Sequence, residues 1–303
     1  MDISPLSLNQ LRAEAIDAKH SIAKHSKSFN WAARFFSADL SQPVSKLYAL
    51  CRYLDDLADG NDPNRAQKLC TIQSLFDQHE QPKITFDHDL VLSKRALQDM
   101  LAGFVFDQGT VAIAYEKDLI HYCYQVAGTV GILMCNIMKI DNQRALQHAV
   151  HLGIALQLTN IARDVGEDAT IDRCYIPSDW TGHIAAGEIA QLKTPIKALT
   201  NASKRLLTLA DHYYKSGLLG IKYLPPRAGF VIQLAAHVYR EIGRDLQRHH
   251  YNNLGYRAHS SLIRKLWLTL AMLGGRSEQL LQNIPEPTTP SDDLFKLSGA
   301  YAY

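Results

Sequence analysis

The chain has 303 residues, of which 47% are hydrophobic, so it can bury a large core in one domain or two. A net charge of +2 and the lack of a dense basic run exclude a typical nucleic-acid-binding protein. The five cysteines form no Cys-x-x-Cys pair, which excludes a thiolate zinc site of the usual spacing and fits a reducing cytosol.

Targeting and membrane signals are weak in this sequence. The segment Met1–Lys27 is polar and charged, which is typical neither of a secretory signal nor of a membrane span. The longest apolar runs, Val126–Met134 and Leu266–Leu273, are too short to cross a bilayer. We therefore expect a cytoplasmic protein, and an apolar patch that touches the inner membrane peripherally is left open.

Hydrophobic periodicity predicts helices along the first half of the chain. The predicted helices are Leu11–Lys27, Val44–Ala58, Asn64–Gln78, Leu90–Asp107 and Val111–Lys139. Gly60 and Pro63 end the second of them, and the polar segment Asp77–Asp89, which contains Pro82, is predicted to be a loop.

The second half continues in the same pattern around a central helix. After a break at Thr170–Pro177, the predicted helices are Ile184–Leu192, Pro195–Gly217, Ala228–His250 and Ser260–Leu273. No alternating strand pattern, repeat or composition break is evident. The sequence thus predicts one all-α domain over residues 1–282, with a flexible tail over residues 283–303.

Two acidic ladders stand out from this background. Asn160, Asp164 and Asp168 lie four residues apart, so they share one face of the central helix, with Arg163 beside them. Upstream, Asp55 and Asp59 have the same spacing, and Arg52 lies one turn before them. A single acidic ladder is typical of a solvated helix face, but two ladders flanked by apolar residues favour a cation between them.

Two further segments allow a structural and a functional interpretation. His25-Ser26-Lys27-Ser28-Phe29 offers several hydrogen-bond donors to an anion, or it is a helix end with capping hydroxyls. In Tyr122–Gly131, the glycines Gly128 and Gly131 favour close helix packing; alternatively, small residues leave room for a long apolar ligand with the Tyr122 hydroxyl facing it.

The ladders suggest a reaction. Mg²⁺ takes few protein ligands and completes its shell with phosphate oxygens and water. A diphosphate held by Mg²⁺, Arg52, Arg163 and Lys27 becomes a good leaving group, because the charge that develops on it is already matched. The chemistry implied is the ionisation of a prenyl diphosphate in an apolar pocket.

These residues also carry a family resemblance. Over about His25–Arg264, the chain resembles the squalene/phytoene synthase family of head-to-head prenyltransferases, and is most similar to its bacterial phytoene synthases. The resemblance rests on five motifs in order: His25–Phe29, Arg52–Asp59, Tyr122–Gly131, Gln157–Asp168 and Arg173–Pro177, with a tyrosine-bearing helix at Tyr239. Thr170-Ile171-Asp172 departs from the basic residues and glycine often found there in bacterial phytoene synthases.

The resemblance implies an all-α isoprenoid-synthase fold with a central cavity, and it implies roles for matching residues. The metal ligands would be Asp55, Asp59, Asn160, Asp164 and Asp168. The diphosphates would be held by His25, Ser26, Lys27, Ser28, Tyr48, Arg52, Arg163 and Tyr239. Gln157 and Tyr122 would lie near the reacting carbons, and catalysis would rest on Asp55, Asp59, Tyr122, Arg163 and Asp164.

The leading functional hypothesis is a Mg²⁺-dependent or Mn²⁺-dependent condensation of two geranylgeranyl diphosphates to phytoene, through prephytoene diphosphate. The alternative is condensation of two farnesyl diphosphates to presqualene diphosphate, squalene or dehydrosqualene, with NADPH needed only for squalene. A non-catalytic assembly factor of the same fold, a chain-elongating prenyltransferase and a terpene cyclase are further alternatives. The sequence leaves the oligomeric state open.

Overall fold

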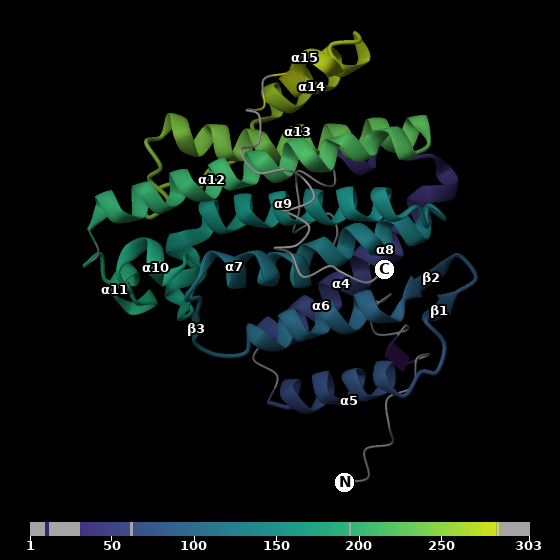
Figure 1. The fold of residues 1–303 in the computed structure, drawn as a ribbon, viewed down its shortest axis with the longest axis horizontal. Coiled ribbons are helices and arrows are strands. Elements are labelled where there is room, and N and C mark those ends of the chain that lie inside the picture. The colour runs from purple at the N-terminus through teal and green to yellow at the C-terminus, as the bar shows by residue number, and fades with distance from the viewer. Residues whose placement is uncertain (1–9, 12–30, 61–62, 194, 283, 285–303) are drawn as a thin grey trace.

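The computed structural model describes residues 10–11, 31–60, 63–193, 195–282 and 284. The helix α9 (Gln143–Thr170) runs through the middle of the molecule (Figure 1). Asn142 caps it, because its side chain accepts a hydrogen bond from the backbone N–H of Ala145 at 3.1 Å. Apolar residues on most sides of α9 are buried, which identifies it as the core helix of the bundle.

Helices surround α9 in layers. Figure 1 shows α12 and α13 on one side of it and α8, α6 and α5 on the other. The longer helices are α4 (Ala38–Asp59), α5 (Arg65–Asp77), α6 (Lys94–Phe106), α7 (Glu116–Cys123), α8 (Thr129–Ile137), α12 (Ile196–Leu218), α13 (Pro226–Arg248) and α14 (Leu262–Leu273). The shorter helical segments are η2 (Tyr124–Gly128), α10 (Ser178–Thr181), α11 (Ala186–Ala190), η3 (Leu219–Tyr223) and α15 (Ser277–Gln282).

Close helix packing explains the glycines of the central layer. A Cβ atom added to Gly131 on α8 would lie 2.3 Å from the backbone oxygen of Ala149 on α9. A Cβ atom added to Gly153 on α9 would lie 2.2 Å from the backbone oxygen of Ala127. Of the two interpretations of Gly131, the packing one therefore holds, since the backbone of α9 fills the space beside it.

Two small sheets correct the predicted elements. The strands β1 (Lys83–Asp87) and β2 (Leu90–Ser93) form an antiparallel hairpin where the sequence predicts a loop and the start of a helix. Ile84 and Phe86 point into the core while Thr85 is exposed, so the segment has the alternation of a half-buried strand. The helix α6 begins only at Lys94, because the Ser93 side chain accepts from the N–H of Ala96.

The predicted helix Val111–Lys139 is also divided. Its first residues form the strand β3 (Val111–Ala112), which pairs in parallel with β4 (Arg173–Cys174) after α9. Between α7 and α8, the segment η2 is a single π-helical turn, a feature found often at functional sites. The all-α prediction is confirmed for the fold as a whole, with these short strands as local exceptions.

The remaining sequence-based expectations concern the two ends of the chain, the bounds of the long helices and membrane-spanning segments. The predicted helix Leu11–Lys27 and the proposed tail at 283–303 lie almost wholly outside the described residues. The predicted ends of the helices that became α5, α12, α13 and α14 agree with the observed ends within two residues or fewer. In the part of the chain that the structure describes, no helix is long and apolar enough to cross a membrane.

Candidate active site

The face of α9 carries the central polar group of the molecule. Asn160 donates from Nδ2 to Oε1 of Gln157 at 3.3 Å, so these two predicted residues lie together. The Oδ1 atom of Asn160 is buried and accepts no hydrogen bond from any described residue. A buried acceptor of this kind is costly unless a ligand meets it.

The two aspartates of this face have different environments. Asp164 accepts from Nε of Arg163 at 2.7 Å and lies 3.2 Å from Nε of Arg257. Burial, followed by the charge of Asp164, raises the pKa of Asp168 to about 7. Asp168 therefore occupies a site where a negative charge is poorly balanced by the described side chains.

On α4, Arg52 forms ion pairs with two carboxylates of the upstream acidic segment. Arg52 Nη1 lies 2.8 Å from Oδ2 of Asp55, and its other terminal nitrogen pairs with Asp56. The side chains of Arg52, Asp55 and Asp56 are 29%, 35% and 48% exposed, so the group lies at a boundary between solvent and protein. Asp59 ends this helix, and its side chain lies outside the described part of the chain.

Tyr239 on α13 connects the polar groups of α4 and α9. Burial, and then Tyr239, raises the pKa of Tyr48 on α4. Burial alone would lower the pKa of Arg163 on α9, but Asp164 and also Tyr239 raise it. Tyr239 is thus within electrostatic range of both helices, and three predicted residues from three helices, Tyr48, Arg163 and Tyr239, are brought together.

Asp107 is the centre of a second buried group that the sequence analysis did not identify. Its carboxylate accepts from the hydroxyls of Tyr122 at 2.8 Å and Tyr175 at 2.7 Å. The two tyrosine rings stack with centroids 4.8 Å apart, and Arg173 Nη2 donates to the Asp107 backbone oxygen at 2.7 Å. Burial raises the pKa of both tyrosines, so their hydroxyls stay protonated as donors.

This second group bears on the first. Asp107 and Arg173 both act electrostatically on Asp168, which places the tyrosine pair beside the C-terminal part of α9. The Tyr122 hydroxyl, which one of the two interpretations of this segment directs toward a ligand, donates to Asp107. Asp107 gives little signal in the sequence, because one aspartate after an apolar helix is typical of a surface turn.

The remaining site residues are those at positions 25–28 and Arg257, which the sequence did not indicate. His25, Ser26, Lys27 and Ser28 lie outside the described residues. Arg257 was missed because it lies in an irregular segment far from both ladders in sequence, yet its Nη1 also lies 2.9 Å from Oε2 of Glu167. A polar cavity of about 300 Å³ lies between α9, α12 and α13; its lining includes Thr159 and Arg240, which are sequence neighbours of Asn160 and Tyr239, but none of the predicted site residues themselves.

The donors on α9 fit a hard divalent cation. They are carboxylate and amide oxygens on successive turns, the chemistry that Mg²⁺ and Mn²⁺ favour. The unmatched Oδ1 of Asn160 and the raised pKa of Asp168 are both features that a nearby cation would relieve. Asn160, Asp164 and Asp168 are therefore suited to hold one.

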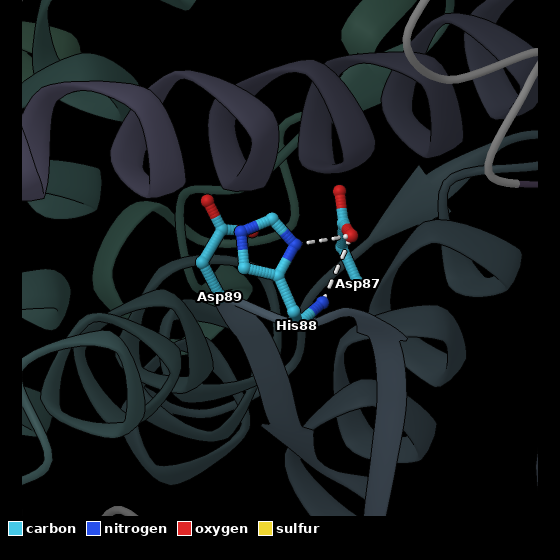
Figure 2. Close-up of side chains that lie close together, drawn as sticks. All are labelled: Asp87, His88 and Asp89. Carbon is cyan, nitrogen blue, oxygen red and sulfur yellow. Dashed lines mark hydrogen bonds and ion pairs between the residues drawn. The ribbon is translucent and has the colours of Figure 1, made fainter.

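A different acidic group lies at the turn between β1 and β2. Asp87, His88 and Asp89 bring ligand atoms within 4.8 Å of one another, and Figure 2 shows the His88 ring beside Asp87. However, Lys46 Nζ already lies 2.8 Å from Asp87 and 2.7 Å from Asp89. Figure 1 shows this hairpin at the opposite side of the molecule from β3. The lysine explains the group as an ion pair that fastens the hairpin to α4.

Comparisons with known proteins identify the family. The family model described as squalene/phytoene synthase matches residues 22–264. The chain belongs to the squalene/phytoene synthase family. The predicted family and the predicted class of enzyme, a prenyltransferase of this type, are thereby confirmed.

Individual relatives agree with this assignment. The chain is 33% identical over 278 residues to a phytoene synthase of Pseudescherichia vulneris, covering 85% of this chain and 90% of the relative. It is 34% identical over 270 residues to a 15-cis-phytoene synthase of Enterobacter agglomerans, covering 82% and 91%.

Solved structures agree on the fold. A dehydrosqualene synthase with a bound ligand aligns with a TM-score of 0.68 at 24% identity, covering 89% of this chain and 98% of that one. The squalene synthase HpnC of Alicyclobacillus acidocaldarius aligns with a TM-score of 0.68 at 20% identity, covering 80% and 96%. The predicted isoprenoid-synthase fold is confirmed.

Proposed function

We propose that this protein condenses two molecules of geranylgeranyl diphosphate head to head and releases phytoene. The observation that carries the proposal is the similarity to phytoene synthases over more than four fifths of the chain. The acidic residues and arginines that such chemistry needs are present on α4 and α9. Joining the two chains gives prephytoene diphosphate and releases one diphosphate and one proton. Ionisation of prephytoene diphosphate then releases the second diphosphate, and the rearranged cation loses a proton to give phytoene.

The carboxylates would hold the divalent cation of the reaction. Asp55 and Asp59 are its proposed ligands on α4, and Asn160, Asp164 and Asp168 are its proposed ligands on α9. A Mg²⁺ or Mn²⁺ ion held by these residues would supply positive charge to the oxygens of the departing diphosphate. The support in the structure is the uncompensated charge and the unmatched acceptor on α9.

The arginines and tyrosines have complementary roles in this proposal. Arg52 and Arg163 bind the departing diphosphate, and Tyr48 and Tyr239 donate hydrogen bonds to it. Arg163 and Arg257 both lie beside the Asp164 carboxylate, so their positive charges are close to the proposed site of the diphosphate. His25, Ser26, Lys27 and Ser28 are proposed as further diphosphate ligands. Gln157 and Tyr122 are proposed to lie beside the reacting carbons.

Asp107 adds a positioning role. Because its carboxylate accepts from both Tyr122 and Tyr175, the two rings are held in one stacked arrangement. A fixed aromatic wall excludes water from a carbocation and stabilises it through the negative face of its rings.

The second candidate is condensation of two farnesyl diphosphates. It is favoured only by the fold similarity to squalene and dehydrosqualene synthases, at identities of 20–24%. The assembly-factor alternative fits less well, because both acidic groups keep their arginine partners.

A product assay tests the proposal. The purified chain is supplied with Mg²⁺ and either geranylgeranyl or farnesyl diphosphate, each with and without NADPH, and the lipid extract is analysed by mass. The proposal predicts phytoene from geranylgeranyl diphosphate without NADPH. A thirty-carbon product from farnesyl diphosphate alone would move the protein to the second candidate, and no product from either would favour the assembly factor.

A further inference from the structure

The helix α14 (Leu262–Leu273) has an apolar outer face. Six of its large apolar side chains are exposed, between 43% for Trp267 and 81% for Ile263. The six are Leu262, Ile263, Leu266, Trp267, Leu270 and Leu273, and we call them the α14 stripe. Their spacing places them along one side of the helix, and scattered exposure would not produce that arrangement.

The opposite side of α14 is anchored in the protein. Leu268, Thr269 and Met272 are buried, and α14 packs on α13. Trp31 Nε1 also donates to Thr269 Oγ1 at 3.2 Å. Figure 1 shows α14 beyond α13, at the outer margin of the molecule. The α14 stripe is therefore the outward side of a fixed helix, in the described part of the chain.

The charge around the stripe is one-sided. Between Asp245 and Glu278 the sequence contains no aspartate or glutamate, but it contains the exposed Arg248, Arg257 and Arg276, the half-buried Arg264 and three histidines; Lys265 is buried. Arg264 stacks over the ring of Trp267, with 4.4 Å between its guanidinium carbon and the ring centroid. An exposed tryptophan with an arginine against it is typical of a side chain pair that lies at a membrane interface.

A second positive group adjoins the stripe. Glu241 on α13 is almost fully buried, accepts a hydrogen bond from Arg248 at 2.6 Å and forms an ion pair with Arg264, whose Nε lies 3.1 Å away. Arg244 also lies 3.5 Å from the same carboxylate. Three arginines thus lie around one glutamate beside α14, and the net charge of these four side chains is positive.

We propose that the α14 stripe docks on the surface of a bilayer that contains anionic lipids. An amphipathic helix with an apolar face and basic flanks binds in the plane of such an interface. A second copy of the chain fits less well as the occupant, because a symmetric contact would bring the basic residues around the α14 stripe of both copies together. The inference rests on the proposed function for its purpose, since a long hydrocarbon product must leave into lipid.

Vesicle flotation with the purified full chain tests this docking surface without any substrate. The variant is Ile263→Asp combined with Leu270→Asp, which places two charges in the stripe. The matched control is Ile196→Asp, an isoleucine of similar exposure, 75%, at the start of α12. Circular dichroism and the thermal midpoint verify that all three proteins are folded.

The expected result has three parts. The wild-type chain and the Ile196→Asp control float with phosphatidylcholine vesicles that contain phosphatidylglycerol. The double variant loses vesicle partition by about tenfold or more. Raising salt to about 1 M, where screening acts within about 3 Å, weakens wild-type binding to these anionic vesicles.

Other outcomes would overturn the proposal. Equal flotation of the double variant and the wild-type chain would remove α14 from the docking surface. Size-exclusion chromatography that finds a wild-type dimer, a monomeric double variant and no flotation of either would assign the stripe to a second copy. Because no substrate is present, these results are distinct from a failed product assay, which would contradict the proposed function alone.

Discussion

At the scale of single residues, the α9 face combines a buried amide oxygen that has no hydrogen-bond partner among the described residues and a carboxyl whose pKa is raised to about 7. Both features cost free energy in the folded protein. Such a cost is typical of a ligand site, where the bound group provides the hydrogen-bond donor or the opposite charge that the protein itself lacks.

The first prediction concerns the proposed metal ligands. Asp164→Asn and Asp55→Asn each remove one negative oxygen ligand, so we expect turnover to fall about 100-fold or more while helical content is unchanged. Steady-state kinetics and circular dichroism measure the two effects. The control is Asp141→Asn, the same substitution at an exposed carboxylate just before α9. Full activity of Asp164→Asn with Mg²⁺ present would refute its assignment.

The second prediction concerns Asp107. Asp107→Asn leaves one buried tyrosine hydroxyl facing an amide N–H₂ group, so we expect the free energy of unfolding to fall by about 1–3 kcal/mol. Urea denaturation measures the change. In a Tyr175→Phe background the same substitution should cost less, because one donor is already gone. An Asp107→Asn variant as stable as the wild-type chain would show that the two hydroxyls find other partners.

At the scale of elements, the close contact between α8 and α9 depends on glycine, which has no Cβ atom. Gly131→Ala should destabilise the protein by about 2 kcal/mol, because its Cβ would lie 2.3 Å from a backbone oxygen that cannot move alone. This outweighs the gain of about 1 kcal/mol that alanine brings to a helix.

A matched glycine provides the control for this prediction. Gly187 lies in the helix α11 with nothing within 4 Å of its would-be Cβ. Gly187→Ala should therefore be neutral or stabilise by up to about 1 kcal/mol. Thermal unfolding of both variants checks the contrast, and equal effects at the two positions would contradict the packing argument.

The sequence predicted α5, α12, α13 and α14 well because their apolar periodicity extends over many turns. It placed the start of α4 at Val44, but the helix begins at Ala38 and contains Pro43. It failed at β1, where only Ile84 and Phe86 carry the alternation and charged residues and Pro82 surround them. It failed at η2 because a π turn has no residue pattern distinct from that of an α-helix. The acidic ladders were visible from spacing, but Asp107 and Arg257 meet their partners only through tertiary structure.

At the scale of the whole molecule, buried histidines make stability depend on pH. Burial, followed by the nearby charges of Arg240 and Arg244, lowers the pKa of His237 from 6.5 to about 4. Between these values the unfolded chain binds a proton that the folded protein excludes. The contribution of His237 to stability is therefore lost as the pH falls below 6.5, whereas Asp168, whose pKa is raised to about 7, contributes a gain in stability over the same range.

The size of this effect is the fourth prediction. From pH 6.5 to about 5, His237 should lower the free energy of unfolding by about 1–2 kcal/mol, since one pKa unit corresponds to about 1.4 kcal/mol. His237→Gln should remove this loss, so that lowering the pH from 6.5 to about 5 costs the variant about 1–2 kcal/mol less unfolding free energy than it costs the wild-type chain. Denaturation curves across this range measure it, and identical slopes in both proteins would exclude His237 as a source.

We propose that α4 and α9 together form one site that binds a prenyl diphosphate and a divalent cation. Calorimetric titration with geranylgeranyl thiodiphosphate, with and without Mg²⁺, tests it most directly because no turnover interferes. We expect binding that requires Mg²⁺ and weakens about tenfold or more in both Asp55→Asn and Asp164→Asn. Binding that is equally tight without Mg²⁺, or unchanged in both variants, would contradict it.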